Sequence, residues 1–266
     1  MRMYLSFFRM RFLTLIQYRA AALAGVATQW AFGLMRILVL HAFYASSDAA
    51  QPMSFEQTVT YVWIGQAMLG ALPSYADSAI MNSVLTGEVA YELTRPLDIY
   101  WMWFARTLAL RTAPTLLRAV PQFVIALLLV PAPYKMALPT PAALAAWLTA
   151  ATFGLLLSTA VTTLMSAFTL WTVRAEGIMR FLPTLVMFFS GMYVPLRLMP
   201  AWAQLAGRLQ PFAGMMDLPA QLFSGSLAPG HVAWIVGLQL SWCAIFVAAG
   251  RALMRGGLRR VTVAGG

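Results

Sequence analysis

The chain has 266 residues, of which 61% are hydrophobic and only 10% are charged, and its mean hydropathy is +0.74. Soluble domains carry about 25% charged residues, so this composition excludes a water-soluble protein and predicts a membrane protein. The net charge of +10 does not indicate nucleic-acid binding, because the only lysine is Lys135 and the arginines are spread between apolar runs instead of forming a basic cluster.

The apolar stretches predict an all-α, polytopic helical bundle that forms a single transmembrane domain over residues 1–266. Residues 1–19 mix arginines with Phe and Leu, which is typical of a helix lying in the membrane interface. A membrane-spanning helix needs about 20 apolar residues. Six later stretches approach this length, and we predict transmembrane helices at 20–44, 57–76, 112–131, 142–169, 179–195 and 232–254.

The arginines predict the orientation of the bundle, because cytoplasmic segments of membrane proteins are enriched in Lys and Arg. The first outer segment, "ASSDAAQPMSFEQ", has neither, and the other two hold only Lys135, Arg197 and Arg208. The segments that we place inside are rich in arginine, with Arg2, Arg9, Arg11, Arg19, Arg95, Arg106, Arg111, Arg174, Arg180, Arg251, Arg255, Arg259 and Arg260. We therefore expect a multi-pass protein of the bacterial plasma (inner) membrane with both termini in the cytoplasm.

The cytoplasmic segment 77–111 is unusual because it is acidic. Glu88, Glu92 and Asp98 lie within "LTGEVAYELTRPLDIYW", although the chain has only 8 acidic residues. The helix of the second span is expected to continue through "ADSAIMNSVL" and to stop at Gly87, since glycine adopts the left-handed conformation that ends helices. Pro96 ends the next short helix, and Asp98 is placed to cap a helix over "IYWMWFARTLALR".

Within that short helix, Val89 and Leu93 lie four residues apart and form an apolar face, while Glu88 and Glu92 form an acidic edge. One interpretation is a solvated loop whose carboxylates balance nearby arginines. The alternative, which the two rigid stops and the apolar face favour, is a docking element for a soluble partner.

Residues 196–225 form a second unusual region, which precedes the last span. The stretch is apolar, but prolines divide it into pieces too short to cross a bilayer, which predicts short re-entrant helices on the outer side. It is either an interfacial loop without function or, as we favour, a lid over the outer end of a pathway.

Arg36 stands out as a charge well inside the first span. A charge at this depth costs a few kcal/mol, so the side chain either has a structural partner or faces a substrate pathway.

Several catalytic motifs are missing from the sequence. It contains no G-x-x-x-x-G-K-[ST], no H-E-x-x-H and no G-x-S-x-G, so it has no P-loop for ATP and no signature of a metalloprotease or serine hydrolase. Cys243 is the only cysteine, and His41 and His231 lie far apart, so we expect no metal site and no enzymatic activity.

Two motifs resemble those of type-2 ABC (ABC-2) exporter permeases, the integral membrane subunits of bacterial ABC transporters. The segment "TGEVAYELTRPLDIYW" carries the first match, through Gly87, Glu88, Ala90, Tyr91, Leu93, Arg95 and Pro96. The outer segment "SGMYVPLRLMPAWAQLAGRLQPF" resembles the S-G-x-x-x-P-L-x-x-x-P pattern of the wider family and includes Gly191, Pro195, Pro200 and Pro211.

The resemblance implies a permease that works as a dimer, with an identical or homologous second subunit and with cytosolic ABC ATPase subunits. It also implies that a coupling helix, formed here by the residues around Gly87, Glu88, Tyr91, Glu92, Arg95 and Pro96, meets the ATPase. ATP and Mg would then bind to the ATPase and not to this chain. Two other functions stay open: a non-transporting scaffold or regulatory membrane subunit, and a membrane enzyme acting on lipid, which the missing acid–base pairs disfavour.

Overall fold

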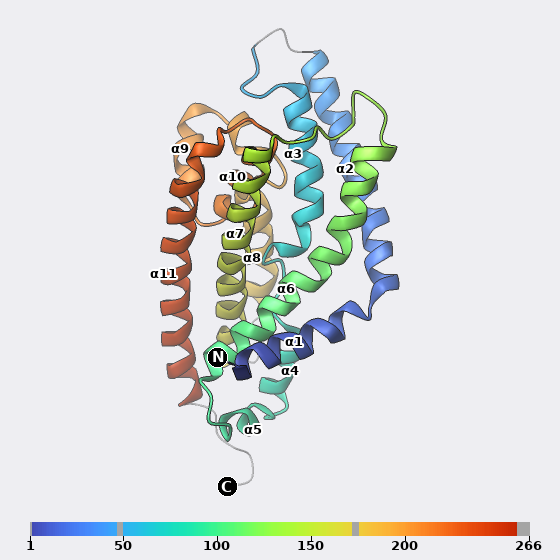
Figure 1. Cartoon of the computed structure of the whole chain (residues 1–266). Helices are drawn as coiled ribbons and strands as arrows, with labels where there is room; N and C mark the ends of the chain where they lie inside the picture. The colour runs from blue at the N-terminus through green and yellow to red at the C-terminus, as the bar shows by residue number, and fades with distance from the viewer. Residues whose placement is uncertain (1, 47–49, 172–175, 260–266) are drawn as a thin grey trace.

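The computed structural model describes residues 2–46, 50–171 and 176–259 (Figure 1). Within these ranges every regular element is a helix and no strand occurs, as the sequence predicts. The α-helices in chain order are α1 (Arg2–Ile16), α2 (Arg19–Ala45), α3 (Phe55–Met68), α4 (Ser78–Leu85), α5 (Val89–Leu93), α6 (Ile99–Val124), α7 (Pro141–Phe168), α8 (Glu176–Phe189), α9 (Ala201–Leu209), α10 (Asp217–Phe223) and α11 (Val232–Leu258).

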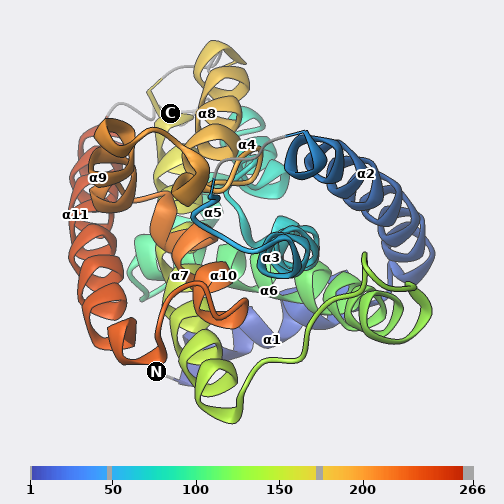
Figure 2. The same ribbon diagram turned by 90° about the horizontal axis from the view of Figure 1, so that it is seen from above.

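Four helices in the described ranges are long and apolar enough to cross a membrane. They are α2, α6 with its π-helical extension (Ile99–Leu129), α7, and α11 with the turn before it (Pro229–Leu258). These helices confirm the first, third, fourth and sixth predicted spans as helices of spanning length. Seen from above, α2 and α11 lie on opposite sides of the bundle, and α3 and α10 lie between them (Figure 2).

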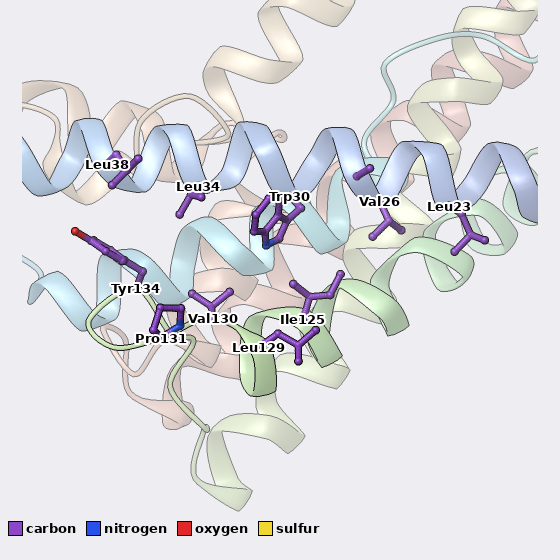
Figure 3. Close-up of a pocket in the computed structure, with 11 residues that line it drawn as sticks. Leu23, Val26, Trp30, Leu34, Leu38, Ile125, Leu129, Val130, Pro131 and Tyr134 are labelled. Atoms are coloured by element: carbon purple, nitrogen blue, oxygen red, sulfur yellow. The ribbon is translucent and has the colours of Figure 1, made fainter.

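An apolar groove of about 590 Å³ separates α2 from the C-terminal end of α6 (Figure 3). The two helices meet near the N-terminal end of α2, where Gly25 allows the Arg118 side chain of α6 to lie against the α2 backbone.

The second predicted span is wrong as a continuous helix. α3 ends at Met68, a 3-10 turn follows at Leu69–Ala71, and α4 begins only at Ser78. The 14 residues of α3 extend about 21 Å, less than the roughly 30 Å of a bilayer core. The helix breaks here because Pro73 forces Leu72 into an extended conformation, with φ −70° and ψ 145°.

The helix that is expected over "IYWMWFARTLALR" is longer than this stretch. The helix that starts at Ile99 does not stop before the third span but continues to Val124 and then, as a π-helix, to Leu129. Pro114 and Pro121 lie inside it without ending it. Membrane helices tolerate internal prolines because neighbouring helices satisfy the freed carbonyl groups. The first half of α6 therefore belongs to the same continuous helix as the third predicted span.

The fifth predicted span is shorter than expected. α8 begins directly after residues 172–175, which lie outside the described part, and ends at Phe189, six residues before the predicted end at 195. Gly191, with φ +76°, provides the left-handed stop at this point.

Residues 196–225 contain short helices, as the proline spacing predicts. A 3-10 turn (Leu196–Leu198) and α9 lie at the end of the bundle, and a second 3-10 turn (Ala213–Met215) leads into α10. All seven residues of α10 are buried, so this part of the segment lies inside the bundle and does not cover it as a lid would.

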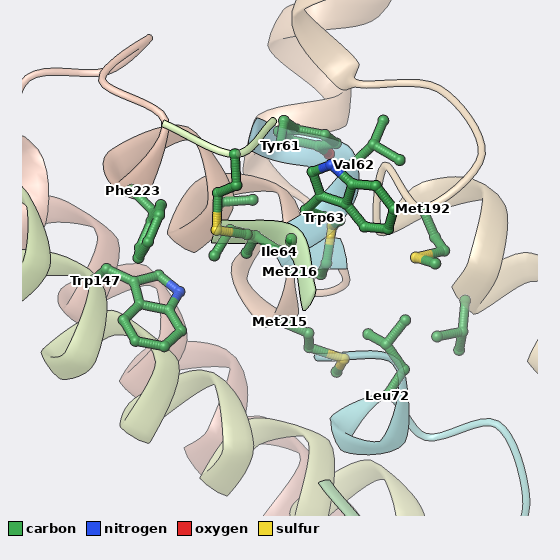
Figure 4. Close-up of a cluster of buried hydrophobic side chains, with 14 of the residues drawn as sticks. Tyr61, Val62, Trp63, Ile64, Leu72, Trp147, Met192, Met215, Met216 and Phe223 are labelled. Carbon is green, nitrogen blue, oxygen red and sulfur yellow. The ribbon is translucent and has the colours of Figure 1, made fainter. Parts of the chain in front are cut away.

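The main core of the bundle forms around α10 and α3 (Figure 4). Trp63 of α3, Trp147 of α7 and Phe223 of α10 belong to one cluster of buried side chains, together with Met215 and Met216. The C-terminal part of the outer segment therefore contributes to the core of the bundle.

α1 packs against α6 and crosses the bundle at the end where α4 and α5 lie (Figure 1). None of its residues is buried, and Leu5, Met10 and Leu13 are exposed. An exposed apolar surface on a helix that also carries Arg2 and Arg9 is what an interfacial helix requires.

Candidate functional site

The candidate site is the segment that joins α4 to α6, at the same end of the molecule as α1. α4 is capped at Thr86, and Gly87 follows with φ +78°. This confirms the predicted glycine stop, because other residues pay about 1–2 kcal/mol for the left-handed conformation. The chain therefore turns sharply into α5.

Glu92 does not contribute to an exposed acidic edge, contrary to the prediction. Its carboxylate accepts a hydrogen bond from Trp103 Nε1 at 2.7 Å, and its other oxygen lies 2.5 Å from Arg106 Nη1. Spacing placed Glu88 and Glu92 on one side of the helix, but the Glu92 side chain is directed to α6. Glu92 is thus the anchor of α5 on α6, and Glu88 is left as the exposed acid.

The predicted apolar face is also divided. Val89 is completely buried among side chains of α4 and α6, whereas Leu93 is 45% exposed. Tyr91 is 76% exposed and is the most prominent side chain of α5. We define the α5 surface by its exposed residues: Glu88, Tyr91, Leu93, Arg95 and Pro96.

The end of the segment is tied to three other helices. Asp98 caps α6 as predicted, since its Oδ1 accepts from Tyr100 N at 2.9 Å. Its Oδ2 lies 2.9 Å from Arg251 Nη2 of α11, and its backbone N–H donates to Tyr4 Oη of α1. The Arg95 guanidinium lies 5.5 Å from the centre of the Phe7 ring of α1. A solvated loop would have no such set of contacts.

Arg111, which the sequence placed in the cytoplasmic segment, is fully buried. Its Nη1 donates to the Leu72 carbonyl at 2.8 Å, its Nη2 donates to the Tyr75 carbonyl, and its Nε donates to Thr162 Oγ1 of α7 at 3.1 Å. The guanidinium also lies 4.3 Å from the centre of the Tyr75 ring. Arg111 therefore supplies donors to the carbonyl groups that the break between α3 and α4 would otherwise leave unpaired.

Asp77 holds the other end of the same break. Its Oδ1 caps α4 through Ala79 N at 2.9 Å and lies 3.2 Å from Arg11 Nη2 of α1. Because the Asp77 side chain is fully buried, this ion pair connects α1 to the start of α4 inside the protein. Segment 72–77 is thus fixed by α1, α6 and α7.

Arg36 reaches from α2 to the outer segment, where its Nη2 donates to the Tyr193 carbonyl at 3.1 Å. The contact gives it the structural partner that one of the two interpretations required. Arg118, within the third predicted span, is another arginine inside a spanning helix, and the prediction overlooked it.

Gly191 and three prolines mark the successive turns of the chain between α8 and α10. Gly191 forms the turn after α8, Pro195 and Pro200 precede the first 3-10 turn and α9, and Pro211 leads to the second turn. Gly191 is required sterically as well, because a Cβ there would overlap Tyr61 Oη and lie 2.7 Å from Asp217 Oδ1.

Asp217 is the centre of this region, and sequence reasoning missed it. The carboxylate is fully buried and accepts from Tyr61 Oη of α3 at 2.7 Å, from Leu196 N at 3.0 Å and from Gln221 Nε2 at 2.6 Å. Tyr61 Oη is also 3.0 Å from the Gly191 carbonyl. These bonds join α3, α10 and both ends of the turn at 191–196. The signal was available, because Asp217 is an acid in an otherwise apolar stretch.

The described residues offer no metal centre, since no group of three or more His, Cys, Asp or Glu side chains is placed to hold an ion. The arrangement instead defines a class of protein: a polytopic membrane protein with a rigidly held surface at the α1 end and without nucleotide-binding motifs of its own.

The chain belongs to the ABC-2 transporter family, since the model of the "ABC-2 family transporter protein" matches residues 31–265. No curated protein and no solved structure matches the chain. Members of this family are membrane permease subunits of ABC transporters, which work with an ATPase subunit and are not catalytic themselves. The match covers the α5 surface and the outer segment, and so includes both motifs on which the resemblance rested.

Proposed function

We propose that the chain is the permease subunit of an ATP-driven exporter and forms the cargo pathway as a dimer with an identical or homologous permease. Cytosolic ATPase subunits bind ATP and Mg and dock on the α5 surface. The observation that carries the proposal is the combination of family membership with an exposed α5 surface whose base is tied to α1, α6 and α11.

The contacts of α5 provide a route for movement. A displacement of Tyr91 by the ATPase would also displace Glu92 on the same short helix. Glu92 is hydrogen-bonded to Trp103 and paired with Arg106 in the first half of α6. Because α6 is continuous to Leu129, displacement at its base tilts the whole helix. Segment 72–77, held by Arg111 of α6, carries the same movement to α3.

The outer segment, including Gly191, Pro195, Pro200 and Pro211, is proposed as the outer boundary of the pathway. Asp217 holds it on α3 and Arg36 holds it on α2, so a movement of either helix displaces it. Arg36 thereby acts on the pathway by positioning the outer segment.

We further propose six membrane crossings, with α3 and α8 as the two short ones, in the bacterial inner membrane. The arginine distribution supports cytoplasmic placement of both termini and of α4 and α5, with α1 as the interfacial helix. A broken second crossing is compatible with a bilayer because Arg111 pairs the carbonyl groups of Leu72 and Tyr75 at the break.

The proposal is tested with Glu88→Lys in the purified permease–ATPase complex reconstituted in vesicles. Glu88 makes no side-chain hydrogen bond or ion pair with the described residues, so its reversal changes the docking surface and not the fold. We expect normal insertion, loss of transport and loss of the stimulation of ATP hydrolysis by the permease. Glu56→Lys is the matched control, because Glu56 is an exposed acid in the first turn of α3, at the opposite end.

Full transport by the Glu88→Lys complex would refute the docking assignment. A complex with an inactive ATPase distinguishes a transporting permease from a non-transporting scaffold or regulatory subunit. If cargo crosses the vesicle membrane only with an active ATPase, the chain is a transporting permease; if no cargo moves with either ATPase, it is a scaffold.

A further inference from the structure

The apolar groove between α2 and α6 is open along two membrane-spanning helices (Figure 3). The wall from α2 runs from Leu23 to Leu38 and includes Trp30, and the facing wall is formed by Ile125 and Leu129 of α6. The α2 wall extends about 22 Å, since each helical residue rises 1.5 Å. Leu129 is 72% exposed, as are large parts of Leu23 and Leu38, so the groove faces the surroundings of these helices, which in a membrane are acyl chains.

Arg118 places a positive charge next to the end of this groove that lies toward the N-terminus of α2. It lies two turns before Ile125 on the same face of α6, and its guanidinium lies against Gly25, between the groove residues Leu23 and Val26 of α2. A Cβ on Gly25 would be 2.8 Å from Arg118 Nε. This nitrogen is buried and has no hydrogen-bond partner among the described residues.

Unpaired groups accumulate at this helix crossing. The amide groups of Gln122, one turn before the groove on α6, and of Gln29, beside Trp30 on α2, are also buried without partners in the described chain. A charged side chain in a membrane-spanning helix costs free energy unless it has a partner, and a phosphate would supply the Arg118 guanidinium with a charge-assisted acceptor.

We propose that this groove binds an anionic membrane phospholipid, with an acyl chain along α2 and its phosphate at Arg118. Basic pockets between membrane helices on the cytoplasmic side recognise such headgroups. The Arg118 end of the groove is the end nearer Arg19, where α2 starts. The charged headgroup therefore fits this end, and the acyl chain fits the apolar lining beyond it. A helix from another protein would fill the apolar walls but would leave the Arg118 charge unpaired.

The test measures lipid binding to the purified, delipidated full chain by native mass spectrometry, with phosphatidylglycerol and phosphatidylcholine as probes. We expect one phosphatidylglycerol to bind with at least tenfold preference. Ala27→Trp fills the groove and should abolish this binding, whereas Ala24→Trp, at an exposed position of α2 that does not line the groove, should leave it unchanged.

Arg118→Gln should remove the preference for the anionic lipid, and Arg118→Lys should keep part of it. Retention of the tenfold preference in Arg118→Gln, or of wild-type binding in Ala27→Trp, would overturn the proposal. If Arg118→Gln fails to fold, the Ala27→Trp and Ala24→Trp pair still decides, because neither change touches the charge.

Discussion

Replacing Glu92 with alanine is expected to release α5 from α6 without unfolding the bundle. The change removes the acceptor of Trp103 Nε1 and the counter-ion of Arg106. The Glu92 and Arg106 side chains are only 16% and 17% exposed, so solvent replaces this partner poorly. Hydrogen bonds to charged groups contribute about 1.5–3 kcal/mol each, and we take the lower end of the sum for two bonds, about 3 kcal/mol. A helix of 5 residues cannot persist alone, so this loss appears as local opening.

The assay is amide hydrogen exchange of residues 86–98 in the purified protein. A loss of about 3 kcal/mol corresponds to a rise of about 100-fold in the local opening constant, since 1.4 kcal/mol is a factor of ten. Exchange in α7 should stay unchanged. Glu88→Ala is the matched control, because Glu88 has no side-chain partner in the described chain, and it should leave exchange at 86–98 as in the wild type. Exchange within threefold of the wild type in Glu92→Ala would refute the anchoring role.

Three further predictions concern stability, measured by thermal unfolding in detergent. Arg111→Met leaves the carbonyl groups at the helix break without donors and should cost about 3–5 kcal/mol, whereas equal stability would show that water or other groups replace the guanidinium. Gly191→Ala should destabilise the protein by at least about 2 kcal/mol more than Gly225→Ala. Both glycines have positive φ, so a backbone strain of about 1–2 kcal/mol is common to both substitutions, but only at Gly191 does the added Cβ overlap neighbouring atoms. Asp98→Ala should cost about 1–2 kcal/mol because it removes the N-cap of α6. Arg251→Gln should cost under about 1 kcal/mol, because the side chains of the Arg251–Asp98 ion pair are 34% and 37% exposed. Equal losses of stability in the two variants would contradict the larger role given to the cap.

The features that the sequence predicted are those that depend on local chemistry. The long apolar runs predicted four spanning helices, Gly87 predicted the sharp turn, and Asp98 predicted the start of α6, because each needs only neighbouring residues. Pro73 carries a local signal for the helix break, but the apolar residues on both sides of it favour one continuous span.

The features that were missed depend on contacts between distant segments. Glu92 is 14 residues from Arg106, and its spacing from Glu88 does not reveal that its side chain turns to α6. Arg111 counted as a topology marker, although its true partners lie 36 to 51 residues away in the chain. Asp217 lies 156 residues from Tyr61, so only the folded chain brings this carboxylate to its donor.

The central claim is that an ATPase subunit docks on the α5 surface. Site-specific photocrosslinking in the assembled transporter tests this claim most directly. A photoreactive amino acid is introduced in place of Tyr91, which is 76% exposed, and in place of Lys135. Lys135 lies beside Glu56 at the start of α3, in the segment before α7, at the end of the bundle opposite α5. The account predicts crosslinks from position 91 to the ATPase and none from position 135. Crosslinks to the ATPase from position 135 but not from position 91 would contradict it.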